Sequence, residues 1–191
     1  MENHKKTIRV LLSLGVLITV FLIYPIPVKA KEPPFREYPI GEEIEKNHMV
    51  IAAVWLPPVR MCCYDGPIEG TIHVEADIHS TEGNPNGFAA GEWMPYLKVT
   101  YEWYRLEELE KNPKASPVLS GEYTPMVAKD GPHYGATIKE PAKGEYLLRY
   151  TIYPPSVNGF GRHMDPVTGV DPWWETFSVE FEFYFGGIEK E

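Results

Sequence analysis

The stretch Thr71-Ile-His-Val-Glu-Ala-Asp-Ile-His79 decides the fold class, because apolar and polar side chains alternate along it without a break. Successive side chains of a β-strand point to opposite faces, so one face of this strand meets a hydrophobic core. The other face carries four residues of metal-ligand type: His73, Glu75, Asp77 and His79. His73 and His79 lie about 20 Å apart at about 3.3 Å per residue, so no single ion can contact all four. The strand therefore predicts one or two ligands of a metal site that distant segments complete.

The rest of the chain continues this pattern of short apolar or alternating segments between turns. Six further segments predict strands: Met49–Leu56, Pro95–Leu106, Val118–Lys129, Tyr134–Lys139, Glu145–Tyr153 and Phe177–Phe185. The polar segment Lys31–Asn47 predicts a leader that lies over the surface. Glu107–Pro117 predicts a charged loop, with one helical turn as the alternative. No long helix is indicated, and the 19 prolines and 16 glycines agree with a fold rich in turns. We predict an all-β, immunoglobulin-like antiparallel β-sandwich.

The first thirty residues predict an export signal. A basic start precedes the apolar stretch Val10–Tyr24, and Val28-Lys29-Ala30 resembles a signal cleavage site. An uncleaved N-terminal anchor is the alternative, although the stretch is short for a membrane span of about 20 residues. We expect residues 1–30 to be this signal and residues 31–191 to be a single domain in the periplasm or another extracytoplasmic space.

The exported chain is strongly acidic. Removing the signal leaves 14 basic and 26 acidic residues, a net charge of −12, because five charged residues leave with it: Glu2, Lys5, Lys6, Arg9 and Lys29. Such a surface repels nucleic acid and anionic lipid, and it attracts cations. We therefore expect no nucleic-acid partner, and contact with a membrane only through residues 1–30.

The two cysteines of the chain, Cys62 and Cys63, are adjacent. An oxidising compartment favours paired cysteines, but Cα atoms 3.8 Å apart lie below the usual disulfide range. A strained bridge between neighbours, a bridge between two chains, thiolate binding of a metal and two free thiols all stay open.

Two histidines lie in segments rich in glycine and proline, which are typical of binding loops: His133 and His163. Imidazole is the commonest metal ligand. The thioether of Met126 would favour copper, Cu(I) above all, whereas carboxylates such as Glu75 and Asp130 would favour harder ions such as Fe²⁺. Neither a G-x-S-x-G elbow nor an H-E-x-x-H zinc motif occurs, so no hydrolase is indicated. The residues themselves predict an extracytoplasmic sandwich with a metal site.

Four stretches, taken together, resemble one known family: Ile72–His79, Asn84–Leu97, Pro125–Ala136 and Gly159–Val170. The family is that of the periplasmic iron-transport-associated proteins that accompany bacterial ferrous-iron permeases. The likeness runs from about Val50 to Phe183, and its most specific part is the Met-Val-Ala-x-Asp-Gly-Pro-His-Tyr-Gly-Ala sequence. The resemblance implies a small immunoglobulin-like protein that forms homodimers, binds copper and iron, and has a membrane iron permease as its partner.

The resemblance also implies a ligand set. The family's copper site uses three histidines and one methionine, which correspond to His73, Met126, His133 and His163. Glu75 and Asp130 match acidic residues beside that site that take part in binding a second ion or iron. The segment Arg60-Met-Cys-Cys-Tyr64 departs from the family pattern, because only its methionine is expected there. Thiolates close to the site would change its metal preference or redox behaviour.

We therefore expect a non-enzymatic metal-binding protein of iron uptake that binds copper and iron and hands iron to a permease. Two alternatives stay open at this point. One is a copper-dependent oxidoreductase acting on iron, and the other is a copper chaperone unrelated to iron. Because neutral imidazoles are required as ligands, we expect metal binding to weaken below about pH 6.

Overall fold

The computed structural model describes residues 36–62 and 66–188, and the predicted signal lies outside these residues. No helix among the described residues is long and apolar enough to cross a membrane. The described elements are ten strands, one short α-helix and one 3-10 helix: β1 (Tyr38–Pro39), β2 (Ile44–Lys46), β3 (Met49–Leu56), β4 (Thr71–Ser80), β5 (Lys98–Arg105), α1 (Leu106–Lys111), β6 (Leu119–Glu122), β7 (Thr124–Val127), β8 (Pro132–Lys139), β9 (Gly144–Tyr153), η1 (Pro155–Asn158) and β10 (Phe177–Phe185).

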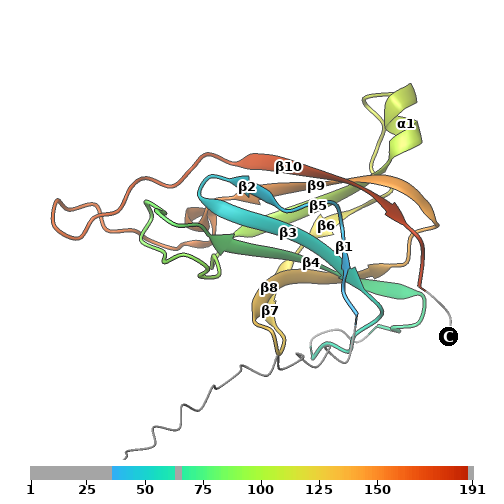
Figure 1. Cartoon of the computed structure of the whole chain (residues 1–191), viewed down its shortest axis with the longest axis horizontal. Coiled ribbons are helices and arrows are strands. Elements are labelled where there is room, and N and C mark those ends of the chain that lie inside the picture. The colour runs from blue at the N-terminus through green and yellow to red at the C-terminus, as the bar shows by residue number, and fades with distance from the viewer. Residues whose placement is uncertain (1–35, 63–65, 189–191) are drawn as a thin grey trace, which may run out of the picture. The chain divides into compact units, whose positions relative to one another are not determined.

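The strands form two antiparallel sheets that pack face to face (Figure 1). One sheet has the order β1-β3-β4-β8-β7, with β2 also paired to β3, and the other has the order β10-β9-β5-β6. This arrangement confirms the predicted immunoglobulin-like antiparallel β-sandwich. The strands predicted at Met49–Leu56 and Phe177–Phe185 have these same bounds in the structure.

The alternation along β4 decides which face meets the core. Ile72, Val74, Ala76 and Ile78 are fully buried between the sheets. Because β4 lies between β3 and β8, both of its backbone edges are hydrogen-bonded. The opposite face of β4 therefore holds its polar side chains in fixed positions.

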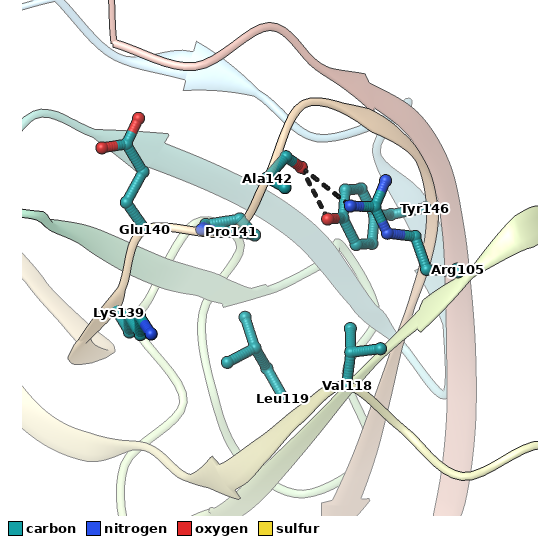
Figure 2. Close-up of a pocket in the computed structure, with 8 residues that line it drawn as sticks. All are labelled: Arg105, Val118, Leu119, Lys139, Glu140, Pro141, Ala142 and Tyr146. Carbon is teal, nitrogen blue, oxygen red and sulfur yellow. Dashed lines mark hydrogen bonds between the residues drawn. The ribbon is translucent and has the colours of Figure 1, made fainter.

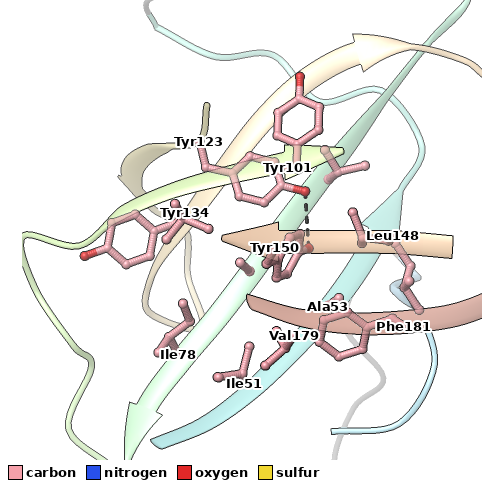
Figure 3. Close-up of a cluster of buried hydrophobic side chains, with 14 of the residues drawn as sticks. Ile51, Ala53, Ile78, Tyr101, Tyr123, Tyr134, Leu148, Tyr150, Val179 and Phe181 are labelled. Carbon is pink, nitrogen blue, oxygen red and sulfur yellow. Dashed lines mark hydrogen bonds between the residues drawn. The ribbon is translucent and has the colours of Figure 1, made fainter. Parts of the chain in front are cut away.

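The core is rich in aromatic side chains, several of which are drawn in Figure 3. The hydroxyls of Tyr123 and Tyr150 lie 3.2 Å apart and hydrogen-bond to each other in the interior. The Tyr150 hydroxyl also donates to the main-chain oxygen of Glu75 at 3.0 Å. Buried hydroxyls need such partners, because an unpaired one costs about 1–3 kcal/mol. This hydrogen bond joins β4 to the facing sheet at Glu75, whose side chain is on the polar face of β4.

Three segments differ from the sequence predictions. Leu106–Lys111 is a helix and not part of a loop; its residues favour helices, and Lys111 lies 3.9 Å from Glu107 one turn earlier. The segment Val118–Lys129 is not one strand, because Tyr123 is buried and the chain passes there from one sheet to the other, as β6 and then β7. The expected surface leader contributes the short strands β1 and β2 at the edge of β3.

Candidate metal centre

Three buried side chains converge on the outer face of the first sheet: His73, Glu75 and His133. Their exposed fractions are only 1%, 6% and 4%. Oε1 of Glu75 lies 3.4 Å from Nε2 of His73 and 3.3 Å from Nε2 of His133. One potential ligand atom from each residue lies within 4.8 Å of the other two. His73 and His133 are 60 positions apart in the sequence, and the fold brings the polar atoms of all three residues together.

Strand register explains this convergence. In the antiparallel pair β4–β8, Glu75 is opposite Gly135 and His73 is opposite Thr137. His133 lies two residues before Gly135 on β8, so its side chain is on the same face of the sheet. Met126 of the edge strand β7 is directly opposite His133. Four predicted ligands thus lie on three neighbouring strands.

The imidazole of His73 is oriented for metal binding. Its Nδ1 lies 3.3 Å from the hydroxyl oxygen of Thr137, which fixes the ring and can accept the Nδ1 proton. Its Nε2 is buried and has no hydrogen-bond partner. Histidine ligands of metals ordinarily use one ring nitrogen for the ion and the other for such a hydrogen bond. The unpaired Nε2 is what a metal-binding histidine presents.

Gly135 leaves space between two of the predicted ligands. A Cβ atom at this position would lie 3.0 Å from Nε2 of His73 and 3.1 Å from Sδ of Met126. The thioether sulfur therefore faces the same small volume as the unpaired imidazole nitrogen. Two imidazoles and a thioether fit copper, because soft sulfur ligands select it over harder ions.

The cluster opens into a cavity of about 170 Å³. Loop residues cover the outer face of the sheet here, among them Arg60, Met61 and Ala128. Two acidic residues also line the cavity: Glu37 and the exposed Asp130. The cavity therefore has an inner side with imidazoles and an outer side with carboxylates.

Burial and nearby negative charges raise the pKa values of the acidic groups at the site. Burial raises the pKa of Glu75 to about 8, and the negative charges of Asp77, Glu37 and Asp130 add to this effect. Burial also raises the pKa of Asp77 to about 6, again with help from Asp130. The pKa of Glu37 is raised by burial and by its hydrogen bond and repulsion with Asp130. The carboxylates repel one another, so a bound cation would relieve the repulsion.

The pKa values of the two histidines are lowered. Burial lowers the pKa of His73 to about 4, and the neighbouring His133 contributes to the shift. Burial lowers the pKa of His133 as well, against the attraction of Asp130. Both imidazoles are therefore neutral at pH 7, the state in which they can bind a metal. A protonated Glu75 can then donate a hydrogen bond to Nε2 of His133, which lies 3.3 Å from its Oε1.

His163 is in a different place. It is exposed, in the long loop between η1 and β10 that extends at the left of Figure 1. This loop bonds to the turn after β4, where the Asp171 amide donates to the Pro85 carbonyl at 3.1 Å. That turn follows Ser80, whereas His73 is near the start of β4, about 23 Å away at 3.3 Å per residue. Within one chain, His163 therefore lies apart from the other predicted ligands.

Three residues at the site were not predicted. Thr137 and Gly135 share the strand face of His133 at spacings of two, so alternation along β8 could have identified them. Glu37 gives no such signal, because it lies in a polar segment far away in the sequence. Of the cysteine pair, Cys62 is exposed and Cys63 lies outside the described residues.

Comparison with known proteins gives consistent matches. Residues 34–187 match the family described as Fe²⁺ transport protein. A UPF0423 protein of Brucella abortus is 41% identical over 163 residues, which cover 82% of this chain and 85% of that protein.

Two solved structures are also similar. A copper-bound variant of FetP from uropathogenic Escherichia coli is 43% identical with a TM-score of 0.74, covering 82% of this chain and 96% of the other. The copper-reconstituted P19 protein of Campylobacter jejuni is 42% identical with a TM-score of 0.73, covering 81% and 99%. The match over most of the sequence and the shared sandwich agree, and the chain belongs to the family of Fe²⁺ transport proteins.

Proposed function

We propose that this protein is a non-enzymatic, extracytoplasmic metal carrier of iron uptake, which binds copper and hands iron to a membrane permease. The observation that carries the proposal is the buried, unpaired Nε2 of His73, which faces the same space as the Met126 sulfur. Membership of an iron-transport family and the copper-bound relatives support it. Export follows from the signal predicted at residues 1–30.

In this proposal His73, His133 and Met126 hold the copper ion. A bound copper ion would supply a concentrated positive charge that can change oxidation state. The chain's own contribution is orientation: Thr137 fixes one imidazole, and Gly135 keeps the space open. Because both imidazoles are already neutral, binding requires no deprotonation of a histidine at pH 7.

The iron substrate would use the carboxylates, which suit a harder ion. Glu75 lies between the imidazoles and the outer acidic residues, so it can serve either ion. Asp130 is exposed and Glu37 half-buried, so cargo at this side has a short path to solvent or to a partner. The acidic surface of the whole chain would raise the local concentration of cations.

The position of His163 supports a homodimer in which a second copy of the chain supplies this imidazole. Although exposed, its Nδ1 lies 2.8 Å from the Thr168 hydroxyl oxygen. The turn beneath it is fixed by Asp165, whose carboxylate accepts hydrogen bonds from the amides of Val167 and Thr168 at 2.9 Å. The Thr168 hydroxyl also donates to this carboxylate. Its hydrogen bond is the largest cause that lowers the pKa of Asp165 to about 2, and the two amide hydrogen bonds add to it. An exposed imidazole that is held at Nδ1 is suited to contact another molecule through Nε2.

The test is titration of the purified protein with Cu²⁺ and Fe²⁺, beside the double variant His73→Ala/His133→Ala. We expect stoichiometric copper binding that the double variant loses. The matched control is His79→Ala, which removes a histidine from the same face of β4 but away from the cluster. Equal copper binding by the double variant, or none by the wild type, would overturn the proposal.

The dimer has its own test. Mixing His163→Ala with His73→Ala chains should restore one complete site per heterodimer, with copper affinity near that of the wild type. If the mixture binds no better than either variant separately, His163 does not act across chains.

A second candidate function is a copper-dependent oxidoreductase acting on iron. The observation that favours it is the contact of the Glu75 carboxylate with both imidazoles. An iron substrate bound by this carboxylate would lie beside a redox-active ion. Turnover separates the two functions. An oxidoreductase would convert many equivalents of iron per copper, and a carrier would convert about one.

A further inference from the structure

A cleft of about 500 Å³ opens where β5 and β8 end and β9 begins. Its volume is within the range of about 300–1,000 Å³ for small-molecule sites. It shares no lining residue with the cavity of the metal centre. Figure 2 shows two cationic side chains, Arg105 and Lys139, with Val118 and Leu119 between them. The cleft is thus a separate feature with charged and apolar parts.

The guanidinium of Arg105 is held in place at one side of the cleft. Its Nη1 donates to the Lys143 carbonyl at 3.0 Å, and a second nitrogen donates to the Ala142 carbonyl at 3.5 Å. The same group lies 4.5 Å above the ring of Tyr146. Gly144 permits this approach, because a Cβ there would overlap Nη1 of Arg105. These contacts use two of the five N–H donors of arginine and leave the others for a ligand.

The cleft is positively charged within an acidic protein. Lys139 forms no ion pair with any residue in the described part of the chain. The acidic residue in the lining is Glu140, whose Oε1 accepts a hydrogen bond from the amide of Ile188 at 3.2 Å. Figure 2 shows this carboxylate directed away from Val118 and Leu119. The apolar lining of the cleft therefore lies between two cationic side chains, and the one carboxylate among the lining residues is directed away from it.

We propose that this cleft binds a small organic anion, with its carboxylate on the Arg105 guanidinium and its apolar body against Val118 and Leu119, while Lys139 adds positive charge from the other side. The guanidinium fork matches the geometry of a carboxylate, and its fixed position reduces the entropy lost on binding. A metal cation would be repelled here. A wholly apolar ligand would leave the two cations without partners as it displaced their water.

The test uses benzoate as the probe, followed by the backbone amide NMR signals of the metal-free protein. We expect saturable shifts at residues 105, 118–119, 139–140 and 142. Arg105→Gln and Lys139→Gln should each weaken binding about tenfold. The matched control is Lys98→Gln, since this lysine is on β5 like Arg105 but is paired with Glu122 at 3.3 Å. Unchanged benzoate affinity in both cleft variants would overturn the proposal.

Two further probes separate charge from shape. Benzyl alcohol keeps the apolar body without the charge, and inorganic phosphate keeps charge without the body; each should bind at least tenfold more weakly than benzoate. Equal binding of either probe, or no saturable binding of benzoate, would refute an organic-anion site. Lys139→Gln leaves the contacts of Arg105 intact and serves as the second test if Arg105→Gln fails to fold. Copper binding by each variant should equal that of the wild type, so this result is independent of the metal centre.

Discussion

Gly135→Ala is the sharpest test of where a metal ion sits, because it leaves every proposed ligand in place. The added methyl carbon would lie 3.0 Å from Nε2 of His73, 3.1 Å from Sδ of Met126 and 3.1 Å from the main-chain oxygen of Val74. Distances this short force neighbours to move by a few tenths of an ångström. The Val74 oxygen belongs to a central strand and resists movement. The imidazole and the thioether therefore have to move.

The size of the effect follows from metal-site tolerances. Metal–ligand distances in functional sites lie within about 0.2 Å of their standard values, so a shift of a few tenths of an ångström at two ligands disturbs the geometry. Changes that misplace ligands in this way typically cost about 10–100-fold in affinity, or about 1.4–2.8 kcal/mol. The metal-free fold should lose little. The backbone of Gly135 is not left-handed, and relief of the glycine entropy cost, about 0.5–1 kcal/mol, offsets the crowding.

The assay is copper titration by calorimetry with a competing chelator, together with urea unfolding of the metal-free protein. The matched control is Gly186→Ala, whose methyl would meet only Tyr184 at an ordinary 3.8 Å. We expect the control to behave as the wild type in both measurements. A folded Gly135→Ala protein with wild-type copper affinity would show that the ion is not held between His73 and Met126.

Two predictions concern protons at Glu75. Its folded pKa of about 8 exceeds the ordinary 4.5, so its contribution to stability is complete below pH 4.5 and is lost as pH rises through 8. His73, with a folded pKa of about 4, opposes this loss only below pH 6.5. Between pH 6.5 and 8 the metal-free protein should lose about 2 kcal/mol, at about 1.4 kcal/mol per unit, and Glu75→Gln should abolish that loss in urea titrations. Copper binding at pH 7 should also release about one proton from Glu75, measured by calorimetry in buffers of different ionisation enthalpy.

Each of these outcomes has a clear contrary result. Parallel stability curves for the wild type and Glu75→Gln between pH 6.5 and 8 would mean that Glu75 is already ionised in the fold. Proton release of the same size in Glu75→Gln would assign the proton to another group. The matched control for both is Glu182→Gln, an exposed carboxylate on β10.

The sequence predicted those parts of the fold that depend on alternation. The pattern of β4 placed Ile72 and Val74 in the core and His73 and Glu75 on the other face, and the structure agrees. The spacing also limited the strand to one or two candidate ligands, and β4 brings two residues, His73 and Glu75, to the cluster. These inferences succeeded because a period of two is enforced by burial along each strand.

Other features could not be predicted, because they depend on contacts between distant segments. Alternation gave no reason to expect that His73 and Glu75, on the polar face of β4, are buried; loop residues such as Met61 line the cavity around them. Glu37 reaches the site from a segment read as a surface leader. His163 was a candidate from its glycine-rich loop and from the resemblance, and neither indicates that it lies beyond the reach of the cluster within one chain.

The structure gives β4 two tasks, and the two support each other. On the inner side, the Tyr150 hydroxyl bonds the main chain of Glu75, and buried aliphatic side chains hold the strand in the sandwich. On the outer side, the same rigid backbone holds a neutral imidazole with an unpaired nitrogen and a carboxyl with a raised pKa. Both are costly without a metal, because buried polar atoms lack partners and acidic groups repel one another. A bound cation would satisfy both at once, so metal binding at this site would stabilise the fold.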